Sequence, residues 1–268
     1  MRHSAFRVNW LATYVVLVAL FLILPELVAI IVSFNPTSRM VMSWTGVSGR
    51  WYQSLWQHEE YFRAFLLSFA IAPCVTVASL LLGGTAAYGV ARLPSRSATA
   101  LQGLFVAPLV VPAAALAVAL FLLLDRLHLT DTLTGVLIGH LIATLPYTFR
   151  TLLVALQSAD RALEEAALSL GASRLAVVRR VTLPLIRPAL VASALFALII
   201  SIDEFTLTWF ISGRSIHTIP LEIFNNTQYG MDPTVAAAST VLIAASAVVI
   251  ILLEKLVGLK TAYAVRPR

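Results

Sequence analysis

Residues 64–91 read AFLLSFAIAPCVTVASLLLGGTAAYGVA, a run of 28 residues without a single Asp, Glu, Lys or Arg. About 20 consecutive apolar residues are enough for a helix to cross the hydrocarbon core of a bilayer. A helix is the expected form, because lipid offers no hydrogen-bond partner to the peptide groups of an irregular chain. This stretch alone predicts a membrane-spanning helix.

Five further stretches are free or nearly free of charged residues. They are residues 8–38, 97–124, 132–149 with its apolar continuation to 159, 188–213 and 233–253. The whole chain is 59% hydrophobic and 12% charged, with a mean hydropathy of +0.89, whereas soluble domains are about one quarter charged. A soluble enzyme and a disordered protein are therefore excluded. The sequence predicts an all-α membrane protein with six transmembrane helices.

The basic residues predict its orientation. Of the 19 Lys and Arg, 14 lie at the N-terminus, in residues 92–96 and 150–187, and in the tail from Lys255. Cytoplasmic loops of membrane proteins are enriched in these residues, so both termini are expected in the cytoplasm. The net charge of +6 is then a consequence of topology, and no nucleic-acid partner is expected. The first stretch is expected to be a retained helix, because Pro25-Glu26-Leu27 follows where a signal peptide would carry small residues.

A patterned cytoplasmic segment, residues 160–184, separates the fourth and fifth stretches. Asp160 is suited to cap a helix over residues 161–170, and Gly171 follows where a left-handed helix stop favours glycine. Ser173 is suited to cap a second helix, which Leu183-Pro184 is expected to break before Pro188 opens the next span. We expect a helix–turn–helix on the cytoplasmic surface.

The detail of this segment resembles the EAA signature of binding-protein-dependent ABC importer permeases. Glu165-Ala166-Ala167, then Gly171, then Val181-Thr-Leu-Pro184 have the spacing of that signature. The alternative is an amphipathic linker that rests on lipid headgroups. The resemblance implies that the segment inserts into a cleft of a separate ATPase. The residues it assigns to ATPase coupling are Glu164, Glu165, Ala166, Ala167, Gly171, Ala172, Ser173, Arg174, Leu183 and Pro184.

Further motifs are similar to those of the spermidine/putrescine permease subfamily. They are Ser33-Phe34-Asn35, Trp51-Tyr52, Ser201–Phe205, Ser212-Gly213 with Thr218–Leu221, and Tyr229–Pro233. This chain has Asp203-Glu204 where the best-known polyamine members have paired aspartates, so an importer of another amine or amino-acid derivative is an alternative. The resemblance implies a type I ABC importer permease fold in the bacterial inner membrane. A first helix with its outer loop (residues 1–63) would precede a permease module (64–254) and a cytoplasmic tail (255–268).

The same resemblance implies the partners. They are a second permease of different sequence, two ATP-binding subunits that hold ATP and Mg²⁺, and an external solute-binding protein that delivers a small cationic solute. This chain itself is expected to bind no cofactor. It contains no Gly-x-x-x-x-Gly-Lys-Ser/Thr loop for phosphates and a single cysteine, Cys74, so neither an ATPase nor a structural zinc site is expected.

Acidic residues within the apolar stretches mark a candidate substrate path. A carboxylate near the bilayer centre costs about 2.5–3.5 kcal/mol on insertion scales and normally faces protein or water. In a continuous helix Glu204 would share a face with Ser201 and Thr208, whereas Asp203 would point about 100° away. The residues assigned to the path are Asp203, Glu204, Ser201, Thr208, Trp209, Glu26 and Tyr147.

Three alternatives stay open at this point. The acids could form interhelical hydrogen bonds that only fix packing. Glu26, Asp203 and Glu204 could instead form the proton or cation relay of an ion-gradient-driven transporter. That class often carries internal repeats, and none is evident between residues 8–124 and 132–253. A membrane scaffold without transport activity is the third alternative.

Overall fold

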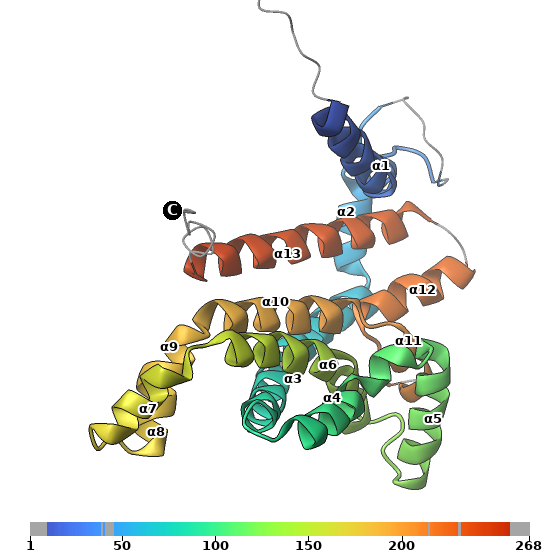
Figure 1. Ribbon diagram of the computed structural model, residues 1–268. Coiled ribbons are helices and arrows are strands. Elements are labelled where there is room, and N and C mark those ends of the chain that lie inside the picture. Colours follow the sequence, from blue (N-terminus) through green and yellow to red (C-terminus); the bar gives the residue numbers. More distant parts are fainter. Residues whose placement is uncertain (1–9, 39, 41–45, 214, 230–231, 258–268) are drawn as a thin grey trace, which may run out of the picture. The chain divides into compact units, whose positions relative to one another are not determined.

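The computed structural model describes residues 10–38, 40, 46–213, 215–229 and 232–257 (Figure 1). Both chain ends, including most of the expected cytoplasmic tail, lie outside this part, as do Gly230 and Met231 of the last motif. The described residues form helices and no strand. The helices are α1 (Trp10–Ser33), α2 (Arg50–Gln57), α3 (Glu59–Val90), α4 (Ser95–Val110), α5 (Ala113–Arg126), α6 (Leu133–Ser158), α7 (Arg161–Ser169), α8 (Arg174–Val177), the π-helix η1 (Val178–Thr182), α9 (Leu183–Leu185), α10 (Arg187–Asp203), α11 (Thr206–Ile211), α12 (Ile219–Tyr229) and α13 (Pro233–Val257).

The chain divides into two units. The first unit comprises Met1–Phe62 and Ile223–Ala244, and the second comprises Arg63–Glu222 and Ala245–Arg268. In the first unit, two side chains of α2 form hydrogen bonds with residues at the end of α1. The Tyr52 hydroxyl lies 2.7 Å from Ser33 Oγ, and Trp51 Nε1 donates to the carbonyl of Asn35 at 2.7 Å. Two sequence motifs that are widely separated along the chain thus contact each other.

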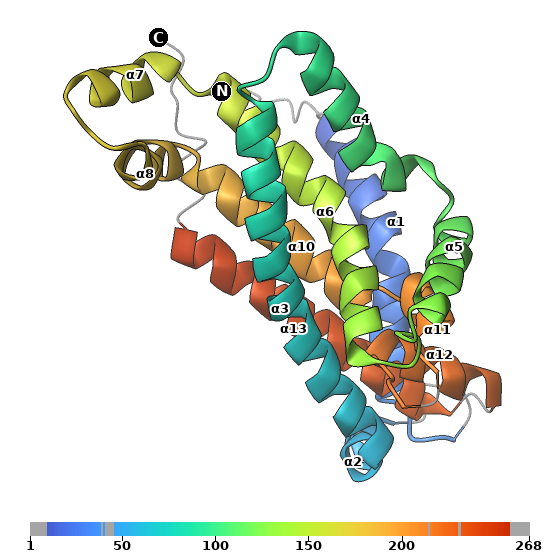
Figure 2. The ribbon, with the colours of Figure 1, turned by 90° about the horizontal axis from the view of Figure 1, so that it is seen from below.

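The second unit is built around α6. Helices α4, α10 and α11 pack against α6, and α5 packs against α11 (Figure 2). Two apolar clusters fill the unit: one includes Phe149 and Leu152 of α6, and the other includes Val136 of α6 and Ile211 of α11. Figure 1 shows α7 and α8 at the end of this unit where α6 finishes and α10 begins, away from α5 and α11.

Helices α3 and α6 approach closely at one glycine. A Cβ atom on Gly83 would lie 3.2 Å from the backbone nitrogen of Phe149 and from the Thr148 side chain. Nearby, Ser79 Oγ and Thr148 Oγ1 are hydrogen-bonded at 2.9 Å. A small residue and a polar pair at a helix crossing are typical of membrane bundles, where small side chains let backbones approach.

The apolar stretch 97–124 is not one straight helix. The sequence predicts kinks at Pro108 and Pro112, and the structure has the bend at Pro112. Helix α4 ends at Val110 and α5 begins at Ala113, and the two axes differ by 103°. Val111 between them is extended, with φ −78° and ψ 132°, because a residue that precedes proline is disfavoured in the helical region. Pro108 lies inside α4 without breaking it.

Four described helices, α1, α3, α6 and α13, are long and apolar enough to cross a membrane. Two bent pairs have the required composition when each is taken as one span: α4 with α5, and Arg174–Leu185 with α10, the latter bent by 75°. By length and composition the described residues therefore supply between four and six spans, and the six spans expected from the sequence are the upper limit.

Candidate functional site

The helix that carries the acidic pair ends at that pair. Helix α10 finishes at Asp203, Glu204 is extended with ψ 105°, and α11 begins at Thr206. The expectation of one continuous helix over residues 188–213 is therefore wrong. Glu204 Oε1 accepts the backbone N–H of Leu207 at 2.8 Å, so its carboxylate satisfies a donor of the first turn of α11 that has no partner within that helix.

His140 of α6 joins the two sides of this break. Its Nδ1 lies 2.9 Å from Ser201 Oγ in α10, and its Nε2 lies 2.9 Å from Thr208 Oγ1 in α11. The imidazole is 1% exposed. The three side chains form a buried polar clamp, which we call the His140 clamp. The polar stripe expected for Ser201 and Thr208 thus exists, but the imidazole of another helix forms it.

The hydrogen bonds of the His140 clamp assign the imidazole tautomer. Thr208 Oγ1 donates its one proton to the carbonyl of Glu204 at 3.0 Å. It must therefore accept from His140, so that Nε2 carries the ring proton and Nδ1 accepts from Ser201. In this arrangement the imidazole is neutral, and both of its nitrogens are satisfied.

The break between α4 and α5 and the break between α10 and α11 border one cavity of about 430 Å³. Small-molecule sites in proteins are commonly about 300–1,000 Å³. The only ionisable groups in the lining are the Glu204 carboxylate and the Tyr147 hydroxyl, and the rest of the lining is apolar. The lining residues are Pro108, Leu109, Val110, Val111, Pro112, Ala113, Leu116, Ile142, Ala143, Tyr147, Ile200, Glu204 and Leu207. We refer to this space as the Glu204 cavity.

The other residues predicted for the substrate path do not line this cavity. Asp203 is exposed beside the break, and Trp209 is 49% exposed and stacks on Phe205 with ring centroids 6.1 Å apart. Glu26 lies on an exposed face of α1, in the first unit. Of the seven predicted residues, the structure thus brings Glu204 and Tyr147 into a shared cavity and uses Ser201 and Thr208 in the adjoining clamp.

Residues 160–184 contain the capped helix that their sequence predicts. Asp160 Oδ1 accepts the N–H of Ala162 at 2.9 Å and caps α7. Gly171 has φ +87°, and its N–H donates to the carbonyl of Leu168 while that of Ala172 donates to Ala167. This pair of bonds is the Schellman helix stop, which requires a left-handed residue at the glycine position. The neighbouring Leu170 is 90% exposed.

The second half of the segment departs from expectation. Ser173 Oγ accepts the N–H of Ala176 at 3.3 Å, as predicted for a cap. Leu183-Pro184, however, does not break the helix, because α8 continues through η1 and α9 as far as Leu185. In η1 the N–H of Leu183 donates to the carbonyl of Val178, five residues earlier, and the chain turns only at Ile186, before α10 begins with Arg187-Pro188.

Glu164 is the centre of a network that ties the segment to α3. Its Oε2 accepts from Arg92 Nη2 at 2.5 Å, and its Oε1 accepts from Thr182 Oγ1 at 2.6 Å. Arg92 also stacks over the ring of Tyr88, 3.3 Å from the centroid, and Arg161 donates to the carbonyl of Ala91. Burial raises the pKa of Glu164, but the hydrogen bonds from Thr182 and Arg92 and the charges of Arg92 and Arg161 outweigh it and hold the pKa below its ordinary 4.5.

The remaining residues assigned to coupling fall on two sides of the segment. Glu165, Ala166 and Gly171 are exposed on α7 and its turn, as are Ser173, Leu183 and Pro184 further along, whereas Ala167 and Ala172 are half-buried. Glu164 and Arg174 line a cavity that they share with Tyr88 of α3. Sequence analysis missed Arg92, for which a Tyr88–Arg92 pair four residues apart was the available signal. For His140, a lone His in an uncharged stretch, the sequence favours a packing hydrogen bond over a place in the substrate path, and the structure has that bond.

The sequence of this chain is similar to those of membrane transport proteins. Residues 79–262 match the family described as binding-protein-dependent transport system inner membrane component. The putrescine transport system permease protein PotI of Escherichia coli K12 is 32% identical over 247 residues, which cover 88% of this chain and 86% of PotI. The spermidine/putrescine transport system permease protein PotC of Haemophilus influenzae is 31% identical over 221 residues, covering 82% of this chain and 86% of PotC.

Solved structures share the fold. A chain of a bacterial ABC transporter that imports the acidic polysaccharide alginate superimposes with a TM-score of 0.72 at 17% sequence identity. The match covers 96% of this chain and 98% of that one. A second structure of a bacterial alginate transporter, in complex with a pentasaccharide-bound periplasmic protein, gives a TM-score of 0.67.

Proposed function

The chain belongs to the family of binding-protein-dependent transport system inner membrane components, and on that premise we propose that it is the permease through which an ABC importer carries a polyamine into the cell. The Glu204 cavity carries the cargo assignment, because it places one carboxylate and one phenol ring in an otherwise apolar lining. Polyamine permeases among the relatives support it.

The chemistry of the Glu204 cavity suits an alkylammonium chain. Each ammonium group loses hydration on entering a narrow path, and a carboxylate offsets that loss through a charge-assisted hydrogen bond. The methylene groups between the ammonium groups favour the apolar wall, and the ring of Tyr147 adds a cation–π contact of about 0.5–2 kcal/mol. One carboxylate binds weakly enough for the cargo to leave, which a transport path requires.

In the membrane we propose six crossings, with α4 and α5 forming one bent span and α10 with α11 forming another, while residues 160–184 stay at the cytoplasmic surface. Both termini face the cytoplasm, which accords with the distribution of Lys and Arg. A second permease completes the path, so the Glu204 cavity is this subunit's share of it. An external solute-binding protein delivers the cargo.

We propose that α7 and its turn couple this path to ATP hydrolysis. The exposed Leu170 and Gly171, with Glu165 and Ala166 on the adjoining helix, insert into a cleft of an ATP-binding subunit, which itself holds ATP and Mg²⁺. Closure of the ATPase pair then moves α7, and the Glu164 network passes the movement to α3. Alternating access follows, with the Glu204 cavity open to the outside when ATP is bound.

Purification of the tagged chain from its native membrane tests the importer assignment. A P-loop ATPase and a second permease are expected to co-purify in fixed ratio. Recovery of the chain alone, with uptake driven by an ion gradient and unaffected by ATP depletion, would favour a secondary transporter instead.

Uptake by the complete complex in proteoliposomes tests the cargo. With the solute-binding protein outside and ATP inside, labelled putrescine or spermidine is expected to accumulate. A cationic amino acid of similar size is the matched control. Import of that amino acid alone would move the assignment to another amine, and import of only neutral or anionic solutes would refute the cationic assignment while leaving the permease assignment intact.

A further inference from the structure

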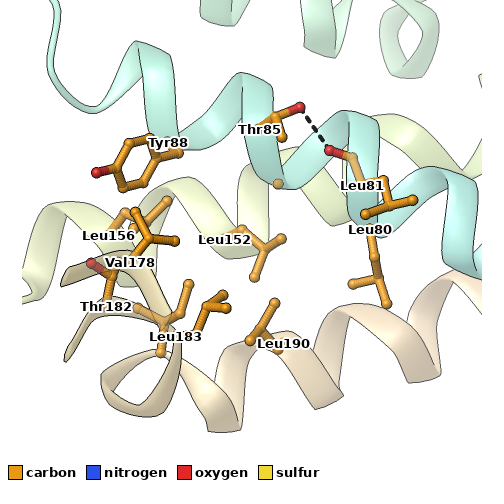
Figure 3. A pocket seen from close by; sticks show the side chains of 12 residues that line it. Leu80, Leu81, Thr85, Tyr88, Leu152, Leu156, Val178, Thr182, Leu183 and Leu190 are labelled. Carbon is orange, nitrogen blue, oxygen red and sulfur yellow. Dashed lines mark hydrogen bonds between the residues drawn. The ribbon is translucent and has the colours of Figure 1, made fainter. Parts of the chain in front are cut away.

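An apolar cavity of about 330 Å³ lies between α3, α6 and the η1–α10 segment, remote from the lining of the Glu204 cavity (Figure 3). In Figure 3 Leu80 and Leu81 of α3 lie at one end of it and Tyr88 and Val178 at the other, with Leu152 of α6 and Leu190 of α10 between them. Leu152 is fully buried, whereas Leu81 is 63% exposed, so the cavity has a closed floor and an open side. We call it the leucine cavity.

A second cavity, of about 580 Å³, adjoins the leucine cavity. Both are lined by Tyr88 and Val178, so these two side chains stand at the boundary between them. The lining of the second cavity is also largely apolar, but it includes three charged side chains, those of Arg92, Glu164 and Arg174. The two together form one elongated space with a hydrocarbon part and a part that holds these charged side chains, which we call the polar part.

The charge of the polar part is positive. Two guanidinium groups face one carboxylate, and that carboxylate is already held by Arg92 and Thr182. The guanidinium group of Arg174 has no hydrogen bond or ion pair within the described part of the chain, and the residue is exposed. The polar part therefore offers one open cation, which an anionic group would complement.

We propose that this space binds one anionic phospholipid of the cytoplasmic leaflet, with an acyl chain in the leucine cavity and the phosphate against Arg174. The proposal rests on the orientation proposed above, which sets α7 and α8 at the cytoplasmic surface. A soluble anion would leave the leucine cavity in contact with water. A zwitterionic lipid carries an ammonium group beside its phosphate, so it would not balance the net positive charge of the polar part. Basic pockets beside transmembrane helices on the cytoplasmic side are known to bind acidic headgroups.

The position of the lipid gives it a role in coupling. Val178, Thr182 and Leu183 form one wall of the leucine cavity, and they belong to the segment that joins α8 to α10. An acyl chain there would fill the space between this segment and α3. The lipid would then make the movement of α7 and η1 more tightly linked to that of α3.

Native mass spectrometry of the complete complex tests the proposal without reference to transport. Detergent-solubilised complex is titrated with phosphatidylglycerol, phosphatidylcholine or soluble glycerol phosphate. We expect phosphatidylglycerol to bind and Arg174→Gln to weaken it about tenfold, as the loss of a charge-assisted hydrogen bond predicts. Arg126→Gln, an exposed arginine in the last turn of α5, is the matched control and should leave binding unchanged.

A second variant tests the hydrocarbon part. Leu81→Trp fills the open side of the leucine cavity and should also weaken phosphatidylglycerol binding, whereas Leu122→Trp on exposed α5 should not. Equal binding by Arg174→Gln and Arg126→Gln, or equal binding of phosphatidylcholine, would overturn the proposal. Strong binding of glycerol phosphate that Leu81→Trp leaves unchanged would show a free-phosphate site and also overturn it. Absence of polyamine uptake with lipid binding intact would contradict only the proposed function.

Discussion

Thr182, the last residue of η1, donates its hydroxyl proton to Glu164 in the first turn of α7, over an Oγ1–Oε1 distance of 2.6 Å. The other oxygen of the same carboxylate accepts from Arg92, directly after α3. One side chain thus connects the segment proposed to meet the ATPase with a long apolar helix. The carboxylate is 17% exposed, so water competes only weakly for it.

The hydrogen bond between Glu164 and Thr182 should make the effects of substituting these two residues on stability non-additive. Glu164→Gln and Thr182→Val are each expected to lower the free energy of unfolding by about 1 kcal/mol, because each removes a charge-assisted hydrogen bond. The double variant should lose less than the sum of the two, as measured by thermal unfolding of the purified complex. Thr99→Val, at an exposed threonine of α4, is the control, and strictly additive losses would show that the two residues act independently.

The same carboxylate predicts a pH dependence. The pKa of Glu164 is lowered from 4.5 in the folded protein, so the folded state favours the ionised form. Its contribution to stability is therefore complete above pH 4.5 and is lost as the pH falls through the lowered pKa. The difference in unfolding temperature between the parent and Glu164→Gln should be constant at neutral pH and shrink under acidic conditions. A difference that grew on acidification would contradict this sign.

Gly171→Val is expected to uncouple transport without preventing membrane insertion. The glycine has φ +87°, and nothing lies within 4 Å of a Cβ atom placed there, so the effect is one of backbone conformation alone. A left-handed conformation costs about 1–2 kcal/mol for an ordinary residue and more for a β-branched one. Cargo uptake and ATPase association are measured together. Gly171→Asn, which tolerates this conformation, should retain more of both, and normal uptake by Gly171→Val would refute the coupling role.

Loss of the imidazole from the His140 clamp should destabilise the break between α10 and α11. His140→Leu leaves the buried hydroxyl of Ser201 without its partner at a cost of about 1–2 kcal/mol. Adding Ser201→Ala removes the unpartnered hydroxyl and is expected to restore part of the loss. A double variant no more stable than His140→Leu would mean that the imidazole acts by filling volume.

Substitutions of Glu204 separate its role in capping α11 from its proposed role in binding the cargo. Glu204→Gln keeps an oxygen that accepts the N–H of Leu207, so stability should be nearly unchanged while the polyamine uptake rate falls about tenfold. Glu204→Leu loses the cap as well and should also lower stability by about 1 kcal/mol. Asp203→Asn, beside the Glu204 cavity but not in its lining, should reduce uptake less. Parental uptake by Glu204→Gln would assign the carboxylate to structure alone.

Several features of this chain could be predicted from residues that are adjacent in the sequence. The caps at Asp160 and Ser173 and the left-handed Gly171 follow from residues adjacent in sequence, and the structure has all three. The kink predicted at Pro112 belongs with them, because proline disfavours the helical region for Val111 before it. Such features depend on interactions within a few residues, which a single sequence displays directly.

Features that depend on distant residues could not be predicted in this way. Nothing in the apolar run around Glu204 marks a helix end, since the break is held by His140, more than 60 residues earlier in the chain. Glu164 was assigned to the ATPase with its neighbours, but its partner Arg92 lies 72 residues away. In both cases the tertiary contact decides the direction in which the side chain points.

The π-helix η1 sets the direction in which the side chains of the following helix, α9, point around the helix axis. Its wider turn takes in one residue more than an α-helix would, and each residue advances a helix by about 100°. Thr182 faces Glu164, and Leu183 faces the leucine cavity, only with that extra residue in place. Removal of one residue from Val178–Thr182 would rotate α9 against α7 as a whole. In this segment the number of residues is therefore under a stricter constraint than their identity.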